Sequence, residues 1–254
     1  MPRTHPRGTL RQHLPLHRLR GHRRRGAGRG RGDGLRVSTA SALLCLGGEP
    51  LAEVERTWRA LDEAGCDTCY VMDDFTLCAA IAARTRNTRI CCLTRSHDSS
   101  RVVEAARTLQ YVSGRRFVLG VGPLADDLGP FGPVTAAERL VEEVSGLVEP
   151  LPVIVFGSGA GPARLAAELA ESWLTTAVPG QVQRRRVQLD ELCRRLGRTR
   201  PPRCSVAVPA GHAPDAFAGA GADEVVSTLD RPLCSAEDAA AWLRSVGADD
   251  VRSA

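Results

Sequence analysis

Short apolar runs alternate with longer segments of helical period along most of this chain. Such runs, without polar alternation, are typical of strands buried on both faces. We expect strands at residues 36–46, 68–72, 89–94, 113–122, 152–156, 172–178, 203–208 and 223–229. The intervening segments predict helices at residues 51–64, 75–85, 99–112, 135–148, 162–171, 181–196, 215–220 and 235–246.

This alternation predicts an α/β fold, and the count of strands favours a (β/α)₈ TIM barrel. A doubly wound open sheet is the alternative, because the strands expected at residues 36–46 and 172–178 are weakly marked. Both architectures place ligands at the carboxyl ends of parallel strands. Candidate chemistry is therefore sought in the residues that follow each strand.

The fourth run carries glycine at its carboxyl end, at Gly120 and Gly122. A missing side chain lets a ligand approach the backbone closely. We therefore expect these two glycines to form the floor of a cofactor site. Coordinates that bury both of them beneath side chains, with no concave opening that joins them to Gly159, would contradict this expectation.

A second glycine-rich segment follows the fifth predicted strand and leads into a helix. Its residues are Gly157, Ser158, Gly159, Ala160 and Gly161. Backbone N–H groups of such a turn, at a helix N-terminus, suit a phosphate group. A tight connection without a ligand is the alternative interpretation, because many such turns serve only that purpose.

Charge divides the chain into two parts. Residues 1–36 hold eleven arginines and one acid, whereas the remainder holds 23 arginines and 28 acids, and there is no lysine. The first part has few apolar residues, so we expect residues 1–35 to be a disordered Arg/Gly-rich tail and residues 36–254 to form the barrel. An inert or mis-assigned tail, an RNA contact and a targeting peptide remain open for the tail. Nucleic acid is not expected elsewhere.

The cysteines and the apolar runs indicate a compartment. Nine cysteines are an odd number, and Cys45, Cys91, Cys92 and Cys204 lie within apolar runs. No secretory segment is present, and no run approaches the roughly 18 apolar residues of a membrane span. We therefore expect a cytoplasmic protein without a membrane contact. The Cys66–Cys69 spacing has no matching second pair, so no metal is expected.

Four segments resemble the bacterial luciferase-like superfamily, which includes flavin-dependent monooxygenases and F-420-dependent oxidoreductases. They are residues 64–75, 85–90, 105–122 and 152–162, and the most specific is the Ser-Gly-Arg-Arg-Phe-Val-Leu-Gly-Val-Gly run within 105–122. Order and spacing agree across roughly residues 36–246. The resemblance implies a TIM barrel that binds FMN or the deazaflavin coenzyme F-420 at the carboxyl ends of its strands.

The chain departs from the family pattern in three places. The Asp-His pair of relatives is Asp73-Asp74 here, so the histidine often assigned to proton transfer is absent. Arg115 stands where relatives have glycine, and only 29 residues separate Gly122 from Pro152. Relatives usually carry a long insertion in that region, which helps to cover the substrate. A shortened insertion implies an open or altered site.

The resemblance assigns roles to further residues. Asp74 replaces the family histidine as the nearest proton carrier, and helix capping is its alternative role. Apart from the resemblance, His97 lies in the loop after the third strand, on the catalytic face of a barrel, and is a second catalytic candidate. A solvated loop histidine is the alternative. Leu93 and Thr94 end the third strand, where relatives hold a cis peptide behind the flavin ring, and we expect the same here.

Together these features predict a flavin- or deazaflavin-dependent oxidoreductase or luciferase-like monooxygenase. It would transfer hydride to or from a small organic substrate, with F-420 or FMN as cofactor. A vestigial flavin-binding barrel without catalytic activity is the alternative. A homodimer is expected as the assembly. The run Arg184, Arg185 and Arg186 is interpreted as a solvated helix face or as a contact for an acidic cofactor tail.

Overall fold

The computed structural model describes residues 40–45, 49–95, 98–122, 134–147, 150–210, 212 and 214–246. The tail expected at residues 1–35 lies outside this range, as do His97 and, within the shortened segment between Gly122 and Pro152, residues 123–133 and 148–149. Every statement below concerns the described residues.

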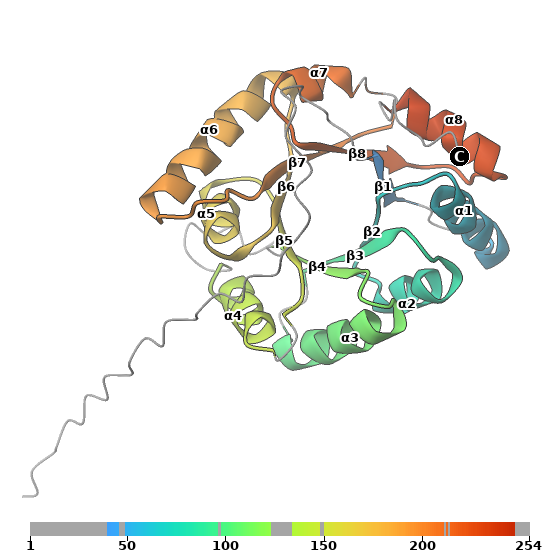
Figure 1. Ribbon diagram of the computed structural model, residues 1–254, viewed down its shortest axis with the longest axis horizontal. Coiled ribbons are helices and arrows are strands. Elements are labelled where there is room, and N and C mark those ends of the chain that lie inside the picture. Colours follow the sequence, from blue (N-terminus) through green and yellow to red (C-terminus); the bar gives the residue numbers. More distant parts are fainter. Residues whose placement is uncertain are drawn as a thin grey trace, which may run out of the picture. The chain divides into compact units, whose positions relative to one another are not determined.

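Eight parallel strands close into a barrel in the order of the sequence (Figure 1). The (β/α)₈ prediction is confirmed, and the open sheet is excluded because the first strand pairs with the last, with Leu43 opposite Thr228. The strands are β1 (Ala40–Leu44), β2 (Thr68–Met72), β3 (Arg89–Thr94), β4 (Phe117–Val121), β5 (Val153–Phe156), β6 (Ser172–Thr176), β7 (Arg203–Val208) and β8 (Glu224–Leu229).

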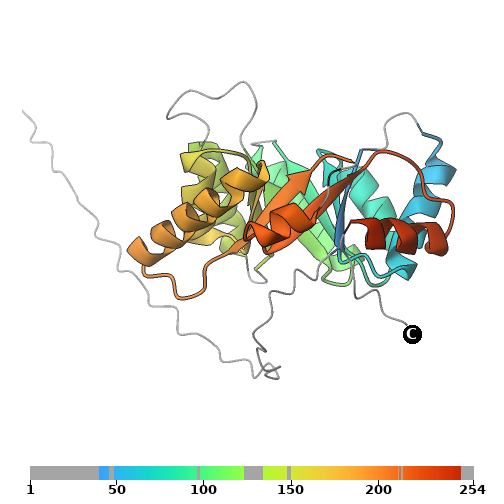
Figure 2. The same ribbon diagram turned by 90° about the horizontal axis from the view of Figure 1, so that it is seen from above.

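A helix follows each strand, and the helices form a ring outside the barrel (Figures 1 and 2). Three begin after a capping residue: the side chains of Asp74, Asp98 and Ser235 each accept a backbone N–H of the first turn. The helices are α1 (Leu51–Glu63), α2 (Phe75–Arg84), α3 (Ser99–Val112), α4 (Val134–Ser145), α5 (Ala160–Leu169), α6 (Pro179–Arg195), α7 (Asp215–Gly219) and α8 (Ala236–Ser245).

Two helices begin two residues earlier than the pattern predicted. Helix α5 starts at Ala160, because Gly159 just before it has φ of 113° and so breaks from the helical backbone, and Pro162 lies inside the first turn. Helix α6 starts at Pro179, whose fixed φ suits a first helical position. The start of α5 matters for function, because it places the glycine-rich turn directly at the helix N-terminus.

Three apolar clusters result from the alternation of side chains along each strand: an outer core, an inner core and a smaller cluster that includes Val206, Val225 and Phe217. The outer core lies between strands and helices and contains Trp58, Trp173 and Cys92, among other buried residues. The inner core fills the barrel with Tyr70, Cys91, Leu93, Val118, Ile154, Leu174 and Val226. The neighbours Cys91 and Cys92 therefore face opposite sides of β3, as predicted. Cys45 is exposed, contrary to expectation, because it follows the last residue of β1.

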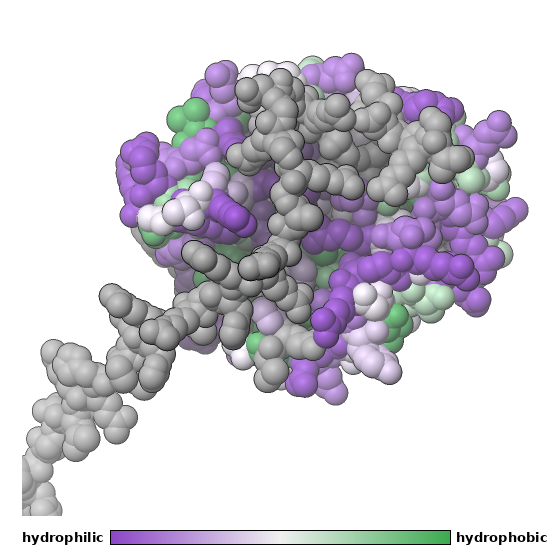
Figure 3. Space-filling model, in the orientation of Figure 1, coloured by the Kyte–Doolittle hydropathy of each residue, from purple (hydrophilic) through white to green (hydrophobic). Residues whose placement is uncertain are grey.

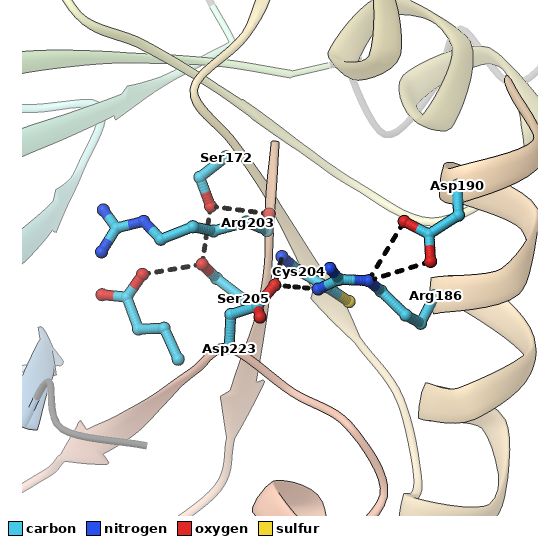
Figure 4. A network of polar contacts seen from close by, with 8 residues as sticks. Ser172, Arg186, Asp190, Arg203, Cys204, Ser205 and Asp223 are labelled. Carbon is cyan, nitrogen blue, oxygen red and sulfur yellow. Dashed lines mark hydrogen bonds and ion pairs between the residues drawn. The ribbon is translucent and has the colours of Figure 1, made fainter. Parts of the chain in front are cut away.

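A buried carboxylate lies inside the barrel near the amino ends of the strands. Glu224 is fully buried, and its two oxygens accept hydrogen bonds from Ser41 (2.7 Å), Tyr70 (3.1 Å) and Ser205 (2.7 Å). Ser172 in turn lies 2.6 Å from Ser205, oxygen to oxygen (Figure 4). Burial, and then the charge of Glu224, raise the pKa of Tyr70 well above its usual range. This network is a polar floor of the barrel, at the end opposite the expected site.

Arg116, the arginine within the family signature, clamps the connection between α2 and β3. It donates to the carbonyl oxygens of Ala82 (3.0 Å), Thr85 (2.9 Å) and Thr88 (2.6 Å). Arg198 does the same for the last turn of α5 and the residue after it. Unsatisfied carbonyls at a helix C-terminus are stabilised by such cations. Arg116 is therefore a structural residue at the amino end of the barrel.

Candidate functional site

The residues that follow β2, β3, β4 and β5 meet at one end of the barrel, because all strands are parallel. These are Asp73 and Asp74, the end of β3 at Leu93 and Thr94, Gly122, and the turn at residues 157–161. The structure thus brings the sequence-predicted residues to a common edge. His212, after β7, is exposed at the same end.

Gly120 and Gly122 do not form a bare surface, and this expectation was wrong. Both glycines are buried. A Cβ at Gly120 would lie 2.5 Å from Cδ2 of Leu93, and one at Gly122 would lie 2.5 Å from two ring atoms of Phe156. The register explains why, since Leu93 pairs with Gly120 across β3 and β4, and Phe156 follows the pair of Val121 and Val155. The glycines accommodate these two larger side chains.

Asp74 is the N-cap of α2, which confirms the capping interpretation. Its Oδ1 accepts the backbone N–H of Leu77 at 2.8 Å, and the residue is exposed. Asp73 has a left-handed backbone, with φ of 50°, and binds Arg95 twice, at its backbone N–H and at Nε, both at 2.7 Å. The two acids at the end of β2 are thus each engaged locally.

The end of β3 contains no cis peptide bond, nor does any other described segment, so the cis peptide expected at Leu93–Thr94 was wrong. Both residues are buried, and the carbonyl oxygen of Thr94 accepts the N–H of Gly122 at 3.2 Å. Leu93 points into the barrel and contributes to its inner core. It is the side chain of Leu93, rather than its peptide bond, that shapes the site here.

The glycine-rich turn after β5 has the backbone that a phosphate loop needs. Gly157 and Gly159 have φ of 123° and 113°, which side chains rarely adopt. The turn leads into α5, whose first N–H groups have no partner within a helix. Ser158 is exposed at the centre of the turn. These N–H groups form a set of hydrogen-bond donors suited to an anion. The Ser158 hydroxyl lies beside them and donates to the carbonyl oxygen of Thr176 at 3.5 Å.

This turn is held from behind by residues of β6 and α6. Trp173 Nε1 donates to the carbonyl oxygen of Gly157 at 2.9 Å. Thr175 Oγ1 lies 3.4 Å from the Ser158 hydroxyl and accepts a hydrogen bond from Arg185 at 2.6 Å. The guanidinium of Arg185 also lies over the Trp173 ring, 5.8 Å from its centroid. A half-buried cation therefore stands directly behind the turn.

The three consecutive arginines of α6 have different surroundings, which the sequence did not reveal. Arg184 is exposed, whereas Arg185 reaches Thr175. Arg186 pairs with Asp190 and Asp223, and Asp223 also accepts the N–H of Cys204 (Figure 4). Burial lowers the pKa of Arg186, but the two acids outweigh it and the pKa is raised. Only Arg185 is directed at the candidate site.

The remaining candidate chemistry is sparse in the part of the chain that the structure describes. All nine cysteines are free, and no three His, Cys, Asp or Glu residues gather there as a metal site would require. Burial raises the pKa of the Cys91 thiol, and it raises that of Cys204 to about 11. None of the described helices combines the length and apolarity of a membrane span. Hydrophilic residues predominate over hydrophobic ones among the coloured residues of the face shown in Figure 3.

Comparisons with known proteins support the barrel. No family model and no curated protein matches the sequence. Among solved structures, an F-420-dependent secondary alcohol dehydrogenase in complex with an F-420–acetone adduct matches with a TM-score of 0.67 and 12% identity, over 85% of this chain and 100% of that one. Monooxygenase RslO1 from Streptomyces bottropensis matches with a TM-score of 0.58 and 15% identity, over 80% and 96%.

The chain shares their fold. An aldolase, QR15, matches as well, with a TM-score of 0.56 and 14% identity, over 84% of this chain and 97% of that one. At these identities the likeness establishes the barrel alone, and one barrel hosts many chemistries. The function must therefore be argued from the residues at the carboxyl end.

Proposed function

We propose that this protein is an oxidoreductase of the luciferase-like class, which binds F-420 or FMN at the carboxyl end of its barrel. The sequence resemblance over residues 105–122 and 152–162 supports this class, and so does the fold shared with an F-420-dependent dehydrogenase and a monooxygenase. The bound cofactor would supply hydride transfer, and the protein would bind and orient it beside a small organic substrate.

The observation that carries the proposal is the turn between β5 and α5. Both F-420 and FMN contain a phosphate group. The backbone N–H groups of residues 158–161, the Ser158 hydroxyl and the N-terminus of α5 would hold that group. Arg185 lies behind this turn and adds positive charge, and its partners are the neutral side chains of Thr175 and Trp173. The phosphate end of either cofactor fits the residues present.

The part of the site that would hold the flat ring of the cofactor differs from the expectation. Because Leu93 and Phe156 cover Gly120 and Gly122, a flat ring would meet side chains rather than the bare β4 backbone. Asp74 remains the proposed proton carrier, through the carboxylate oxygen that does not cap α2. His97 is the second proposed proton carrier, and it lies outside the described residues.

A non-catalytic flavin-binding barrel is the second candidate. Two observations favour it, the use of Asp74 as a helix cap and the side chains over the glycines. The two candidates share the binding step and differ in turnover. We would load the full-length protein with reduced F-420 or FMN and follow cofactor oxidation with a panel of small carbonyl compounds and with oxygen.

Turnover that Asp74→Asn reduces at least tenfold would support the enzyme. An expected loss of this size follows from the typical contribution of general acid–base catalysis, on the order of a hundredfold or more. Stable binding without any turnover would favour the second candidate. If neither F-420 nor FMN binds, both candidate functions are contradicted.

A further inference from the structure

Among the described residues, Phe156 is an aromatic side chain at the carboxyl end of β5, beside β4. It is the last residue of β5 and is half-buried. Ile154, two residues earlier on the same face, belongs to the inner core, and Phe156 packs against that core. The ring therefore points into the barrel at its carboxyl end, on top of the apolar filling.

The Phe156 ring crosses from β5 to β4 and lies against Gly122. Three of its atoms, Cε2, Cζ and Cδ2, stand 2.5 to 2.7 Å from the position of a Cβ at Gly122. Any side chain at position 122 would displace the ring. The Phe156 ring fills the space that a side chain at position 122 would need, so only glycine fits there. A ligand at this point would meet an aromatic surface.

The same residue stands immediately before the turn at residues 157–161. The ring reaches toward the neighbouring strand, and adjacent strands lie about 4.8 Å apart. A cofactor whose phosphate is held by the turn would carry its flat ring, through a short polyol chain, across this part of the mouth. The positions of turn and ring suit a ligand with a phosphate at one end and an aromatic system at the other.

We propose that Phe156 is the specificity-determining residue of the barrel mouth, on which the flat ring of the cofactor lies in place of the β4 backbone. This inference rests on the proposed function. Offset stacking of two aromatic systems contributes about 0.5–1.5 kcal/mol beyond the burial of area. Phe156 would thereby select flat heteroaromatic ligands and would fix how deeply they enter the barrel.

The test is a double-mutant cycle on the full-length protein, with FMN, F-420 and riboflavin as titrants. Phe156→Ala is expected to weaken the binding of all three by about tenfold, since stacking and buried area are both lost. Phe75→Ala is the matched control, because Phe75 is also half-buried but packs on Phe117 in the outer core. It is expected to lower the unfolding temperature and to leave binding within twofold.

Gly122→Ala distinguishes contact with the side chain from contact with the backbone. In the presence of Phe156 it is expected to weaken binding, because the new methyl group displaces the ring. In the Phe156→Ala background it is expected to have no further effect. Thermal unfolding of each variant confirms that it is folded, and Phe156→Leu replaces Phe156→Ala if the alanine variant does not fold.

The outcomes separate this inference from the function on which it rests. Unchanged or tighter binding by Phe156→Ala, while the wild type binds, would overturn the role of Phe156 and leave the proposed function intact. Equal weakening by Gly122→Ala in both backgrounds would show that the ring lies on the backbone, and would also overturn it. Failure of both the wild type and Phe156→Ala to bind any of the three titrants would overturn the inference and the proposed function together.

Discussion

Trp173 donates its indole N–H to the carbonyl oxygen of Gly157 at 2.9 Å, and this bond joins the outer core to the candidate phosphate turn. Trp173 is fully buried between β6 and the helices, whereas the turn is at the surface. The contact fixes the peptide group of Gly157, at which the turn begins. A rigid residue of the scaffold thus sets the conformation of a functional loop, which is how binding sites are usually pre-organised.

Trp173→Phe removes that hydrogen bond and retains an aromatic ring. We expect it to lower the free energy of unfolding by about 1 kcal/mol more than a matched tryptophan replacement, the typical net value of one hydrogen bond. Trp58→Phe is the control, since Trp58 is equally buried and its Nε1 has no partner among the described residues. Urea unfolding of the three proteins measures the difference, and equal losses would contradict a role for the bond.

Arg185→Gln is expected to weaken FMN binding by three- to tenfold and to leave riboflavin binding unchanged. Riboflavin lacks the phosphate, and the guanidinium acts on the anion through its charge and through the Thr175 hydroxyl. Arg184→Gln removes the same charge from an exposed neighbour on α6 and should affect neither ligand. Equal effects of both variants would indicate net charge alone and would contradict a specific role for Arg185.

Glu224→Gln tests the polar floor of the barrel. The carboxylate accepts three hydroxyl hydrogen bonds, whereas an amide offers one acceptor oxygen and leaves hydroxyl donors without a partner. We expect a loss of about 1–3 kcal/mol in the free energy of unfolding, the cost of buried unsatisfied groups. Glu237→Gln, in the exposed first turn of α8, should change it by less than about 0.5 kcal/mol. An unchanged free energy of unfolding in Glu224→Gln would show that the network does not stabilise the barrel.

Asp62 is expected to make stability depend on pH in the acid range. Burial raises the pKa of its carboxyl group, but backbone N–H groups of Thr88, Arg86 and Asn87 outweigh this and hold the pKa below its usual value of 3.8. A pKa lowered by folding contributes stability above the unfolded value and loses it as the pH falls through the folded value. The advantage of wild type over Asp62→Asn should therefore be full at pH 7 and decline below about pH 4.

Urea unfolding of both proteins between pH 7 and pH 3 checks this dependence. We expect a difference of about 2 kcal/mol at pH 7, since hydrogen bonds to charged groups are worth about 1.5–3 kcal/mol. A difference that stays constant over the whole range would show that the Asp62 carboxylate charge plays no part in holding the loop after α2.

The barrel could be predicted from local signals. Apolar runs, helical spacing and a capping residue such as Asp74 act over a few residues, and the sequence carries them directly. Even the weakly marked first strand was correctly placed, because a closed barrel supplies partners on both of its sides. Helix starts near Gly159 and Pro179 were displaced by two residues, since local backbone conformation decides them.

The site could be predicted only in part, because it depends on contacts between strands. Gly120 and Gly122 were expected to be bare, but the register places Leu93 and Phe156 beside them. The same register unites Glu224 with Ser205, which are adjacent across β7 and β8. Such pairs follow from the order of the strands rather than from any local pattern. The sequence could not single out Arg185 within its run of three arginines, because three consecutive residues of a helix point in three directions.

The measurement that tests the central claim most directly is a titration of the full-length protein with F-420 and with FMN, followed by cofactor fluorescence. We expect saturable binding of at least one of them with one site per chain, and weaker binding of FMN to Arg185→Gln than to Arg184→Gln. Failure of both cofactors to change their fluorescence, in a protein that unfolds cooperatively, would contradict a cofactor site at the carboxyl end of this barrel.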